Sequence, residues 1–231
     1  MYDRTIDGQV YTFGVSGKLI RNVLVMFDRE TDTLWSQLLG EAVDGPLKGT
    51  QLTPIPAVQT TWAEWKKTHP DTLALDIGGP AYDSYNSYYS SNQAGVIGET
   101  LQDERLPRKE LVHGLVIDGQ PVAYPFSQLS QEGAVNDEVN GVPILVLYDS
   151  QTTTALAFRR EVDGQVLTFL PVPGDSATFM DEETGSEWLA LTGAAVSGPL
   201  AGKQLERLPG TSSFWFGWKD FYSDTLVYGV Q

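Results

Sequence analysis

The sequence predicts a mainly β protein, a β-rich α+β fold in which two sequence-related copies pack as a pseudo-two-fold β-barrel or sandwich-like assembly with short helices. Three observations lead to this prediction. Short apolar runs alternate with turn residues along most of the chain, which is typical of strands. One long segment occurs twice, and such internal repeats indicate a duplicated structural unit. With 231 residues and 41% hydrophobic residues, the chain can bury a substantial core.

The repeat aligns Asp28–Leu73 with Asp181–Leu226 without a gap, and almost half of the aligned residues are identical. All 6 tryptophans fall into pairs: Trp35 with Trp188, Trp62 with Trp215 and Trp65 with Trp218. Paired glycines and prolines mark the same turns in both copies. These are packing anchors and special backbone positions, whereas few reactive polar groups match. We therefore favour a shared scaffold over a repeated active site.

Three regions follow from the repeat. Residues 1–75 form a first copy, residues 76–111 a connector rich in tyrosine and serine, and residues 112–231 a second, complete copy. The first copy lacks about two strands and a helix, because its opening residues align with the end of a strand in the second. An uncovered edge is a liability. It is resolved by a sheet shared between the copies, by a homodimer that completes the shortened copy, or by further chain in a longer protein.

Apolar runs bounded by turn residues predict the strands. We expect strands at 9–14, 22–28, 33–38, 142–148, 154–159 and 165–170, the last three as a meander. Pro143 is expected at the start of its strand, where a missing N–H does least harm.

Two segments predict helices. Thr61–His69 has Thr60 or Thr61 as N-cap and stops at Pro70, and Pro125–Gly133 ends on a glycine. The connector is expected to be a long surface loop, which is either functional or poorly ordered.

The composition restricts the partners. A net charge of -15 disfavours nucleic acids and anionic membrane surfaces, because both attract lysine and arginine. The absence of cysteine excludes disulfides, thiolate nucleophiles and zinc–thiolate sites. No apolar run is long enough to cross a membrane, and the polar first residues predict no signal peptide in this chain.

Several runs carry a family resemblance. The run FGVSGKLIRNVLVMFDRETDTLWSQLLGEAVDGPLKG at 13–49 and the run TWAEWKKTHPDT at 61–72 resemble the bacterial and archaeal domain-of-unknown-function family 3179. The later runs VIDGQPVAYPFSQL, VNDEVNGVPILVLYD and TALAFRREVDG resemble the same family, so the similarity covers nearly the whole chain.

The resemblance implies fold and length but no activity. Longer members carry a further N-terminal element that ends in a cysteine-containing segment, and here Asp149 and Thr152 stand where cysteines would stand. Thiol or metal chemistry is therefore not carried over, and we expect no cofactor and no metal. The family resemblance implies an extracytoplasmic setting, secreted or periplasmic, with the cytoplasm as the alternative.

Aromatic and amide side chains give the ligand-binding candidates, since rings beside amide and hydroxyl groups suit saccharides or other flat polar small molecules. These candidates are Trp35, Gln37, Tyr82, Asp83, Tyr85, Tyr88 and Tyr89. Binding residues tend to lie on loops of a rigid scaffold, and the connector is where the copies differ most. The alternative, a purely structural loop, is favoured.

Three other features have simpler interpretations. His69 and His113 need a neighbouring Asp or Ser for a catalytic role, and only Asp71 lies close to either in sequence. The acids of 28–32 resemble part of a calcium loop, but a hairpin turn is favoured. Gly14–Gly17 does not meet the nucleophile-elbow pattern, and a turn is expected.

Two functions remain open. The first is a non-catalytic structural or ligand-binding β module. The alternative is a hydrolase-type enzyme with a carboxylate and aromatic site in the cleft between the copies, using acids such as Asp28, Asp71 or Asp83.

Overall fold

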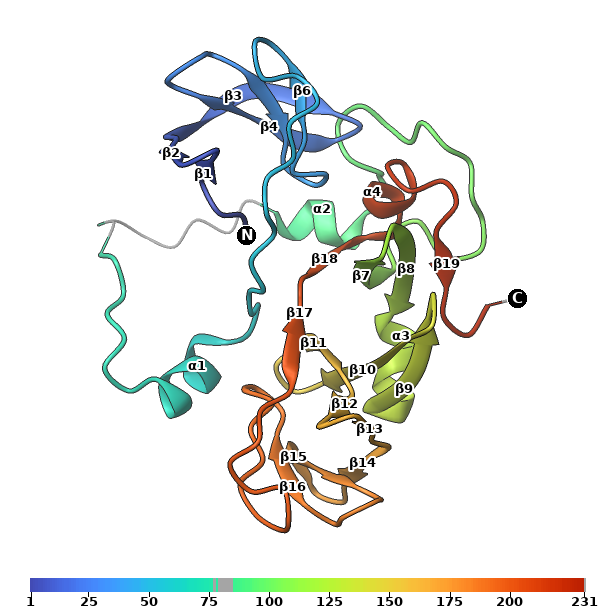
Figure 1. Cartoon of the computed structure of the whole chain (residues 1–231). Coiled ribbons are helices and arrows are strands. Elements are labelled where there is room, and N and C mark those ends of the chain that lie inside the picture. Colours follow the sequence, from blue (N-terminus) through green and yellow to red (C-terminus); the bar gives the residue numbers. More distant parts are fainter. Residues whose placement is uncertain (77, 79–84, 231) are drawn as a thin grey trace.

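The computed structural model describes residues 1–76, 78 and 85–230. The chain is mainly β, with 41% strand and 11% helix in several sheets. The sheets follow one another along an elongated body, with β1–β6 at one end and β14–β16 at the other (Figure 1). Each sheet of the described residues is open, with two to four strands, so the barrel expected from the sequence is wrong. A barrel that side chains can fill needs about eight strands in one closed sheet.

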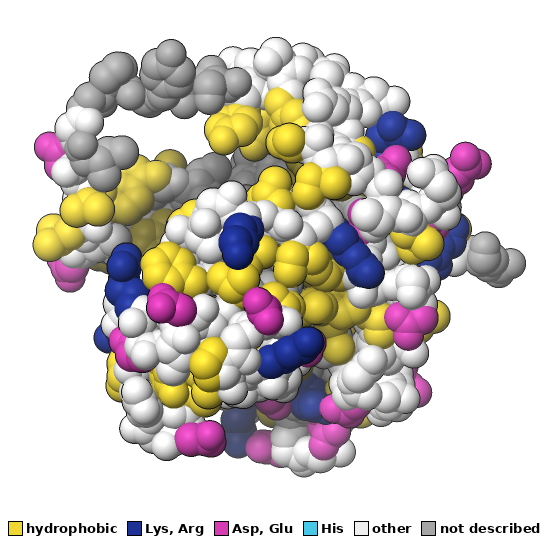
Figure 2. Space-filling view, turned by 90° about the horizontal axis from the view of Figure 1, so that it is seen from above, with side chains coloured by type: hydrophobic (Ala, Val, Ile, Leu, Met, Phe, Trp, Pro, Cys, Tyr) yellow, Lys and Arg dark blue, Asp and Glu magenta, His cyan; other side chains and the backbone are white. Residues whose placement is uncertain are grey.

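The N-terminal lobe, residues 1–56, holds a two-stranded and a four-stranded antiparallel sheet. The small one pairs β1 (Thr5–Ile6) with β2 (Gln9–Val10). The larger has the order β3-β4-β5-β6, with strands Phe13–Ile20, Val23–Asp28, Leu34–Ser36 and Ala42–Asp44. Its core is small and centres on the fully buried Trp35. Acidic, basic and hydrophobic side chains are interspersed on the face seen from above, so the acidic excess does not gather into one patch there (Figure 2).

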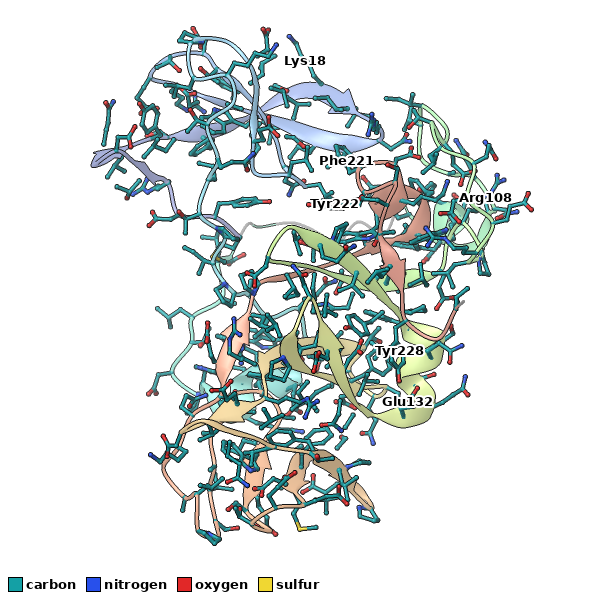
Figure 3. The ribbon with its side chains drawn as sticks, turned by 45° about the vertical axis from the view of Figure 1, so that its right-hand side comes forward. Lys18, Arg108, Glu132, Phe221, Tyr222 and Tyr228 are labelled. Atoms are coloured by element: carbon teal, nitrogen blue, oxygen red, sulfur yellow. The ribbon has the colours of Figure 1, made fainter. Side chains whose placement is uncertain are left out.

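Two four-stranded sheets form the middle of the molecule. One has the order β18-β7-β8-β19, with strands Gly210–Phe214, Leu111–Ile117, Gln120–Pro125 and Leu226–Val227. The other has the order β17-β11-β10-β9, with strands Glu206–Leu208, Thr154–Arg159, Val142–Asp149 and Ala134–Val139. Helix α3 (Phe126–Glu132) connects them and contributes Phe126 and Leu129 to the core that they share. The C-terminal segment lies along α3, where Tyr228 Oη donates to Glu132 Oε2 at 3.0 Å (Figure 3).

The far end holds two small antiparallel sheets. Strands β12 (Glu161–Val162) and β13 (Gln165–Val166) form a hairpin. Strands β14 (Phe169–Val172), β15 (Asp175–Asp181) and β16 (Glu187–Leu189) form the other sheet. A second apolar core joins this sheet to β10 and β11 around the buried Trp188.

Three further helices lie outside these sheets. They are α1 (Trp62–Thr68), α2 (Asn86–Ser90) and α4 (Trp215–Lys219). None of the helices in the described residues has the length and apolar character that a bilayer span requires.

Most expected elements are present with shifted bounds. The strand at 154–159, the strand beginning at Val142 with Pro143 second, and the helix capped by Thr61 are confirmed. The strand expected at 165–170 is split, because residues 165–166 turn back onto β12 and leave the meander. The turn expected at Gly14–Gly17 is wrong: these residues lie inside β3, where a bulge accommodates the positive φ of Gly17.

A buried acid holds the turn between β4 and β5. Asp28 is fully buried, and it accepts hydrogen bonds from the Trp35 indole Nε1 at 2.8 Å and the Thr31 hydroxyl at 2.8 Å. Burial raises the pKa of Asp28, but the hydrogen bonds from Trp35 and Thr31 outweigh burial, so the pKa lies below its ordinary value. The residues 28–32 therefore form a hairpin turn, as expected.

The turn between β15 and β16 has the same bonds. Asp181 is fully buried and accepts from Trp188 Nε1 at 2.8 Å and from the Thr184 hydroxyl at 2.7 Å. In each turn the threonine hydroxyl also lies 2.7 Å from a second hydroxyl, Thr33 in one and Ser186 in the other.

Removing the indole donor tests how much this bond contributes to stability. In Trp188→Phe one aromatic ring is kept, but the indole N–H is lost, so the buried Asp181 carboxylate keeps only the donors of Thr184. We expect the free energy of unfolding, measured by urea denaturation, to fall by about 1–3 kcal/mol. Trp62→Phe is the matched control, because Trp62 is 52% exposed, and its change should stay within about 0.5 kcal/mol. Equal losses in both variants would show that the bond contributes nothing of its own.

Candidate functional site

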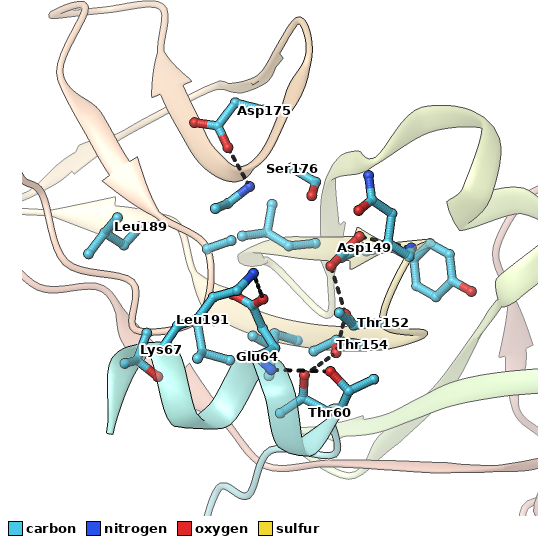
Figure 4. A pocket seen from close by; sticks show the side chains of 18 of the residues that line it. Thr60, Glu64, Lys67, Asp149, Thr152, Thr154, Asp175, Ser176, Leu189 and Leu191 are labelled. Carbon is cyan, nitrogen blue, oxygen red and sulfur yellow. Dashed lines mark hydrogen bonds and ion pairs between the residues drawn. The ribbon is translucent and has the colours of Figure 1, made fainter. Parts of the chain in front are cut away.

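A cavity of about 470 Å³ lies between α1 and the sheets of the second half (Figure 4). Its walls come from α1, from the turn between β10 and β11, from the turn between β14 and β15, and from residues 189–192. Pockets of this size are typical of small-molecule sites.

The floor of the cavity is apolar and its rim is polar. Leu147, Leu156 and Phe179 line the floor and are buried in the second core. Acids, hydroxyls and a lysine line the rim, so a ligand would meet an apolar surface below and hydrogen-bonding groups around it.

Helix α1 supplies one wall of the cavity, and its N-cap fixes the residue at which the helix begins. The Thr61 hydroxyl accepts from the Glu64 backbone N–H at 3.2 Å, and the helix ends at Thr68, with His69 as its C-cap before Pro70. Glu64 and Lys67 form an ion pair of 2.6 Å at the cavity. The hydrogen bond to Glu64 raises the pKa of Lys67, and the Asp149 carboxylate raises it further. Lys67 therefore stays charged.

The turn between β10 and β11 supplies the opposite wall through a chain of hydroxyls. Asp149 accepts from the Gln151 backbone N–H at 2.9 Å and from the Thr152 hydroxyl at 2.7 Å. The Thr152 and Thr154 hydroxyls are 2.7 Å apart, and Thr154 Oγ1 lies 2.8 Å from Thr60 Oγ1, just before α1. This chain fastens α1 to the sheet and ends on a carboxylate at the cavity (Figure 4).

Asp149 differs from Asp28 and Asp181 in one respect. All three begin a turn in which a threonine three residues later donates to the acid and also lies 2.7 Å from a second hydroxyl. The tryptophan that donates to the acid follows seven residues after Asp28 and seven residues after Asp181. At the same distance after Asp149 the residue is Leu156, which has no hydrogen-bond donor in its side chain. Asp149 therefore has no indole above it, is half-buried, and lines the cavity.

The site can accept hydrogen bonds more readily than it can donate them. A carboxylate offers about four acceptor positions, and the two bonds from Gln151 and Thr152 leave Asp149 capacity for a ligand. Lys67 is already paired with Glu64. No group of three or more metal-ligating side chains occurs among residues 1–76, 78 and 85–230.

Three of the tyrosines expected to bind a ligand, Tyr85, Tyr88 and Tyr89, lie elsewhere, on and beside α2. Tyr88 and Tyr89 pack against Phe214, and the Lys109 ammonium lies 3.7 Å from the centre of the Tyr88 ring. Tyr85 and Tyr89 are exposed. Tyr82 and Asp83 lie outside the described residues.

The other two aromatic-site candidates belong to the N-terminal lobe. Trp35 is fully buried and bonded to Asp28, so its indole is not available to a ligand. Gln37 is exposed and lines a different hollow, where its backbone carbonyl accepts from Tyr2 Oη at 2.9 Å. The structure thus does not bring Trp35 together with Tyr85, Tyr88 and Tyr89, the tyrosine candidates that it describes.

The structure describes two of the three acids named for the hydrolase alternative, Asp28 and Asp71. Asp28 is fully buried and hydrogen-bonded to Trp35, so its carboxylate cannot contact a substrate. Asp71 is exposed on the loop after α1.

The histidines have structural surroundings. His69 is exposed and stacks on Trp65 with ring centres 3.9 Å apart. His113 is buried on β7, with its Nδ1 3.3 Å from the Ser212 hydroxyl of β18 and its Nε2 without a partner among the described residues. The serine beside His113 was not foreseen, because it lies on a distant strand.

Burial lowers the pKa of His113 to about 4, which gives a testable pH dependence. An unfolded histidine titrates near pH 6.5, so between pH ~6.5 and about 4 the unfolded chain binds the proton and the folded one does not. The contribution of His113 to the free energy of unfolding is therefore fully present above pH ~6.5. It is lost as the pH drops toward about 4, by at most ~1.4 kcal/mol per pH unit.

The measurement is urea denaturation at a series of pH values. His113→Leu should lose this part of the slope, while the exposed His69→Gln should keep it. Identical pH profiles for the wild type and His113→Leu would contradict the assignment.

The sequence contains one signal for the cavity, which is a recurring spacing of an acid and two hydroxyl residues. Asp, Thr and a second hydroxyl residue recur at the same spacing at 28–33, 149–154 and 181–186, and only the middle set lacks the following tryptophan. The wall from α1 had no such signal, because it comes from a segment far away in the chain.

Comparison with known proteins gives a family without an activity. The family model described as "Protein of unknown function (DUF3179)" matches residues 1–225. Searches of the curated proteins and of the solved structures found no match.

Proposed function

The chain belongs to the DUF3179 family of proteins of unknown function, and we propose that it is a non-catalytic β module that binds a small polar ligand in the cavity between α1 and the β10–β11 turn. One observation carries this proposal. Of three turns with the same hydrogen-bonded acid, only that of Asp149 lacks the tryptophan and leaves the carboxylate at a cavity.

The arrangement favours a ligand with several hydroxyl or amino groups on a compact carbon skeleton. Asp149 and the rim acid Asp175 provide acceptors, and the threonine hydroxyls can donate or accept. The leucine floor suits the apolar face of a ring. A saccharide or similar polyhydroxylated small molecule combines these features. Acceptors and hydroxyls that fix the orientation of a ligand over an apolar floor are what small-molecule sites use for specificity.

Replacing the carboxylate tests the proposal. We expect Asp149→Asn to weaken binding about 10- to 100-fold, because a hydrogen bond to a charged group contributes about 1.5–3 kcal/mol. Ligand-observed NMR against a panel of monosaccharides, disaccharides and amino sugars identifies binders, and titration calorimetry gives their affinities.

Two further variants make the test specific. Leu156→Trp places an indole beside Asp149, as in the other two turns, and should abolish binding; an unchanged circular dichroism spectrum checks that the buried position accepts the larger side chain. Asp163→Asn is the matched control, because Asp163 is an exposed acid away from the cavity that pairs with Lys203, and its affinities should equal those of the wild type. A panel that yields no binder to the wild type, or binders indifferent to both cavity variants, would refute the proposal.

We also infer that residues 1–75 and 112–231 descend from one duplicated unit and pack about a pseudo-two-fold axis in a sandwich-like manner. The shared hydrogen bonds of Asp28 and Asp181 support this. So does the pairing of Tyr2 with Pro54, which matches the pairing of Phe158 with Arg207. An experimental structure in which residues 28–56 failed to superpose on residues 181–209 would overturn the inference.

We propose an extracytoplasmic location, with the cytoplasm as the alternative. Family resemblance and the net charge of -15 support it. Fractionation of cells that express the natural gene decides between the two.

A further inference from the structure

Two of the three acid-centred turns give their carboxylate the same three donors. Asp28 accepts from the Thr31 backbone N–H at 2.6 Å, from the Thr31 hydroxyl at 2.8 Å and from the Trp35 indole N–H at 2.8 Å. Asp181 accepts from the equivalent three groups at 2.6, 2.7 and 2.8 Å. In both turns, two donors belong to the turn itself and the third is an N–H from the strand that follows.

The third turn has only the first two donors. Asp149 accepts from the Gln151 backbone N–H at 2.9 Å and from the Thr152 hydroxyl at 2.7 Å. Among the described residues no third group donates to it, because Leu156 stands in the position of the tryptophan. Asp149 and Leu156 both line the cavity. A ligand that lies on Leu156 can therefore supply the N–H that the indole supplies elsewhere.

The charged side chains of the cavity are mostly acidic. The carboxylates of Glu64, Asp149 and Asp175 and the ammonium of Lys67 lie in the lining described here, which leaves an excess of two negative charges. Lys67 is paired with Glu64 at 2.6 Å, so the excess belongs to Asp149 and Asp175. These two acids come from separate turns, β10–β11 and β14–β15, and both lie at the cavity (Figure 4).

Neither of these two acids is neutralised by a neighbouring cation. The ion pairs formed by the described residues include neither Asp149 nor Asp175. The Asp175 carboxylate accepts from the Ala177 backbone N–H at 2.8 Å, which carries no charge. Arg207 donates to the carbonyl of the lining residue Leu191 but does not itself line the cavity. Walls with an excess of one sign of charge concentrate ligands of the opposite sign.

We propose that the cavity selects a cationic ligand, a hydroxylated ring that carries a protonated amine, of which amino sugars are the simplest case. One ammonium N–H would donate to Asp149 in place of the indole, while the ring lies on Leu147 and Leu156. This inference rests on the proposed function, because it names the ligand class of the same cavity.

The charge of the ligand decides between the classes that fit the cavity. A neutral sugar can donate to Asp149, but it leaves the charges of both acids uncompensated. An anionic sugar would add a like charge beside them. An ammonium makes a charge-assisted hydrogen bond, which is about twice as strong as a bond between neutral groups.

The experiment compares three probes that share one ring: glucose, glucosamine and N-acetylglucosamine. Ligand-observed NMR titration of the full chain, at a mildly acidic pH that keeps the amine protonated, gives each dissociation constant. N-acetylglucosamine keeps the N–H and loses the charge, so it isolates the contribution of the charge. We expect glucosamine to bind at least ~10-fold more tightly than the other two. This preference should shrink at high salt, because salt screens charges at a partly exposed site.

Four variants assign the preference to the cavity. Asp149→Asn and Asp175→Asn should each reduce the ratio of glucosamine to glucose affinity, and the exposed Asp175 serves if Asp149→Asn fails to fold. Lys67→Met removes the cation of the lining, so it should strengthen glucosamine binding more than glucose binding. Asp163→Asn, away from the cavity, is the matched control and should keep the ratio of the wild type.

The possible outcomes separate this inference from the proposed function. Equal affinities for the three probes, or a preference that both cavity acids can lose without effect, would overturn the inference and leave the proposed function standing. A sugar panel in which no member binds would overturn both.

Discussion

The hydrogen bond from a tryptophan indole to a buried aspartate is the constraint on which much of this fold depends. A carboxylate can be buried only if its hydrogen-bonding capacity is met. At Asp28 and at Asp181 the indole and a threonine hydroxyl together meet it, which fixes the turn. Each of these turns also requires a glycine packed against it. A Cβ at Gly45 would overlap Thr33 of the first turn, and a Cβ at Gly198 would overlap Ser186 of the second. One polar contact thereby fixes a hairpin turn and the close approach of a glycine to it at each end of the molecule.

Local patterns predicted some of the elements but not how they combine. The strand at 154–159 and the cap of α1 follow from short-range signals, namely apolar runs and Thr61 before the helix. Whether the sheets close into a barrel depends on long-range pairing such as that of β18 with β7, on which no local signal bears. The burial of Trp35 could not be predicted from the sequence either. A tryptophan among polar residues is equally consistent with a binding surface and with an indole that donates to a buried acid.

The candidate site was harder to predict for the same reason. Its acid lies in a turn whose spacing is visible in the sequence, but its other wall comes from α1, far earlier in the chain. Only the contact of Thr60 with Thr154 brings the two together. What distinguishes Asp149 is the absence of a side chain, with Leu156 in the position of a tryptophan, and an absence becomes informative only once the three turns are seen to be alike.

Helix α1 connects the candidate site to the segment that leads into the helix. Segment 57–61 contains Thr60, whose hydroxyl continues the chain from Thr154 to Asp149 at the cavity. A ligand that ordered this hydroxyl chain would therefore also order the backbone just before α1. Any contact that ordered the same segment beforehand would lower the entropic cost of ligand binding. Because linkage is reciprocal, the ligand would strengthen that contact by the same factor.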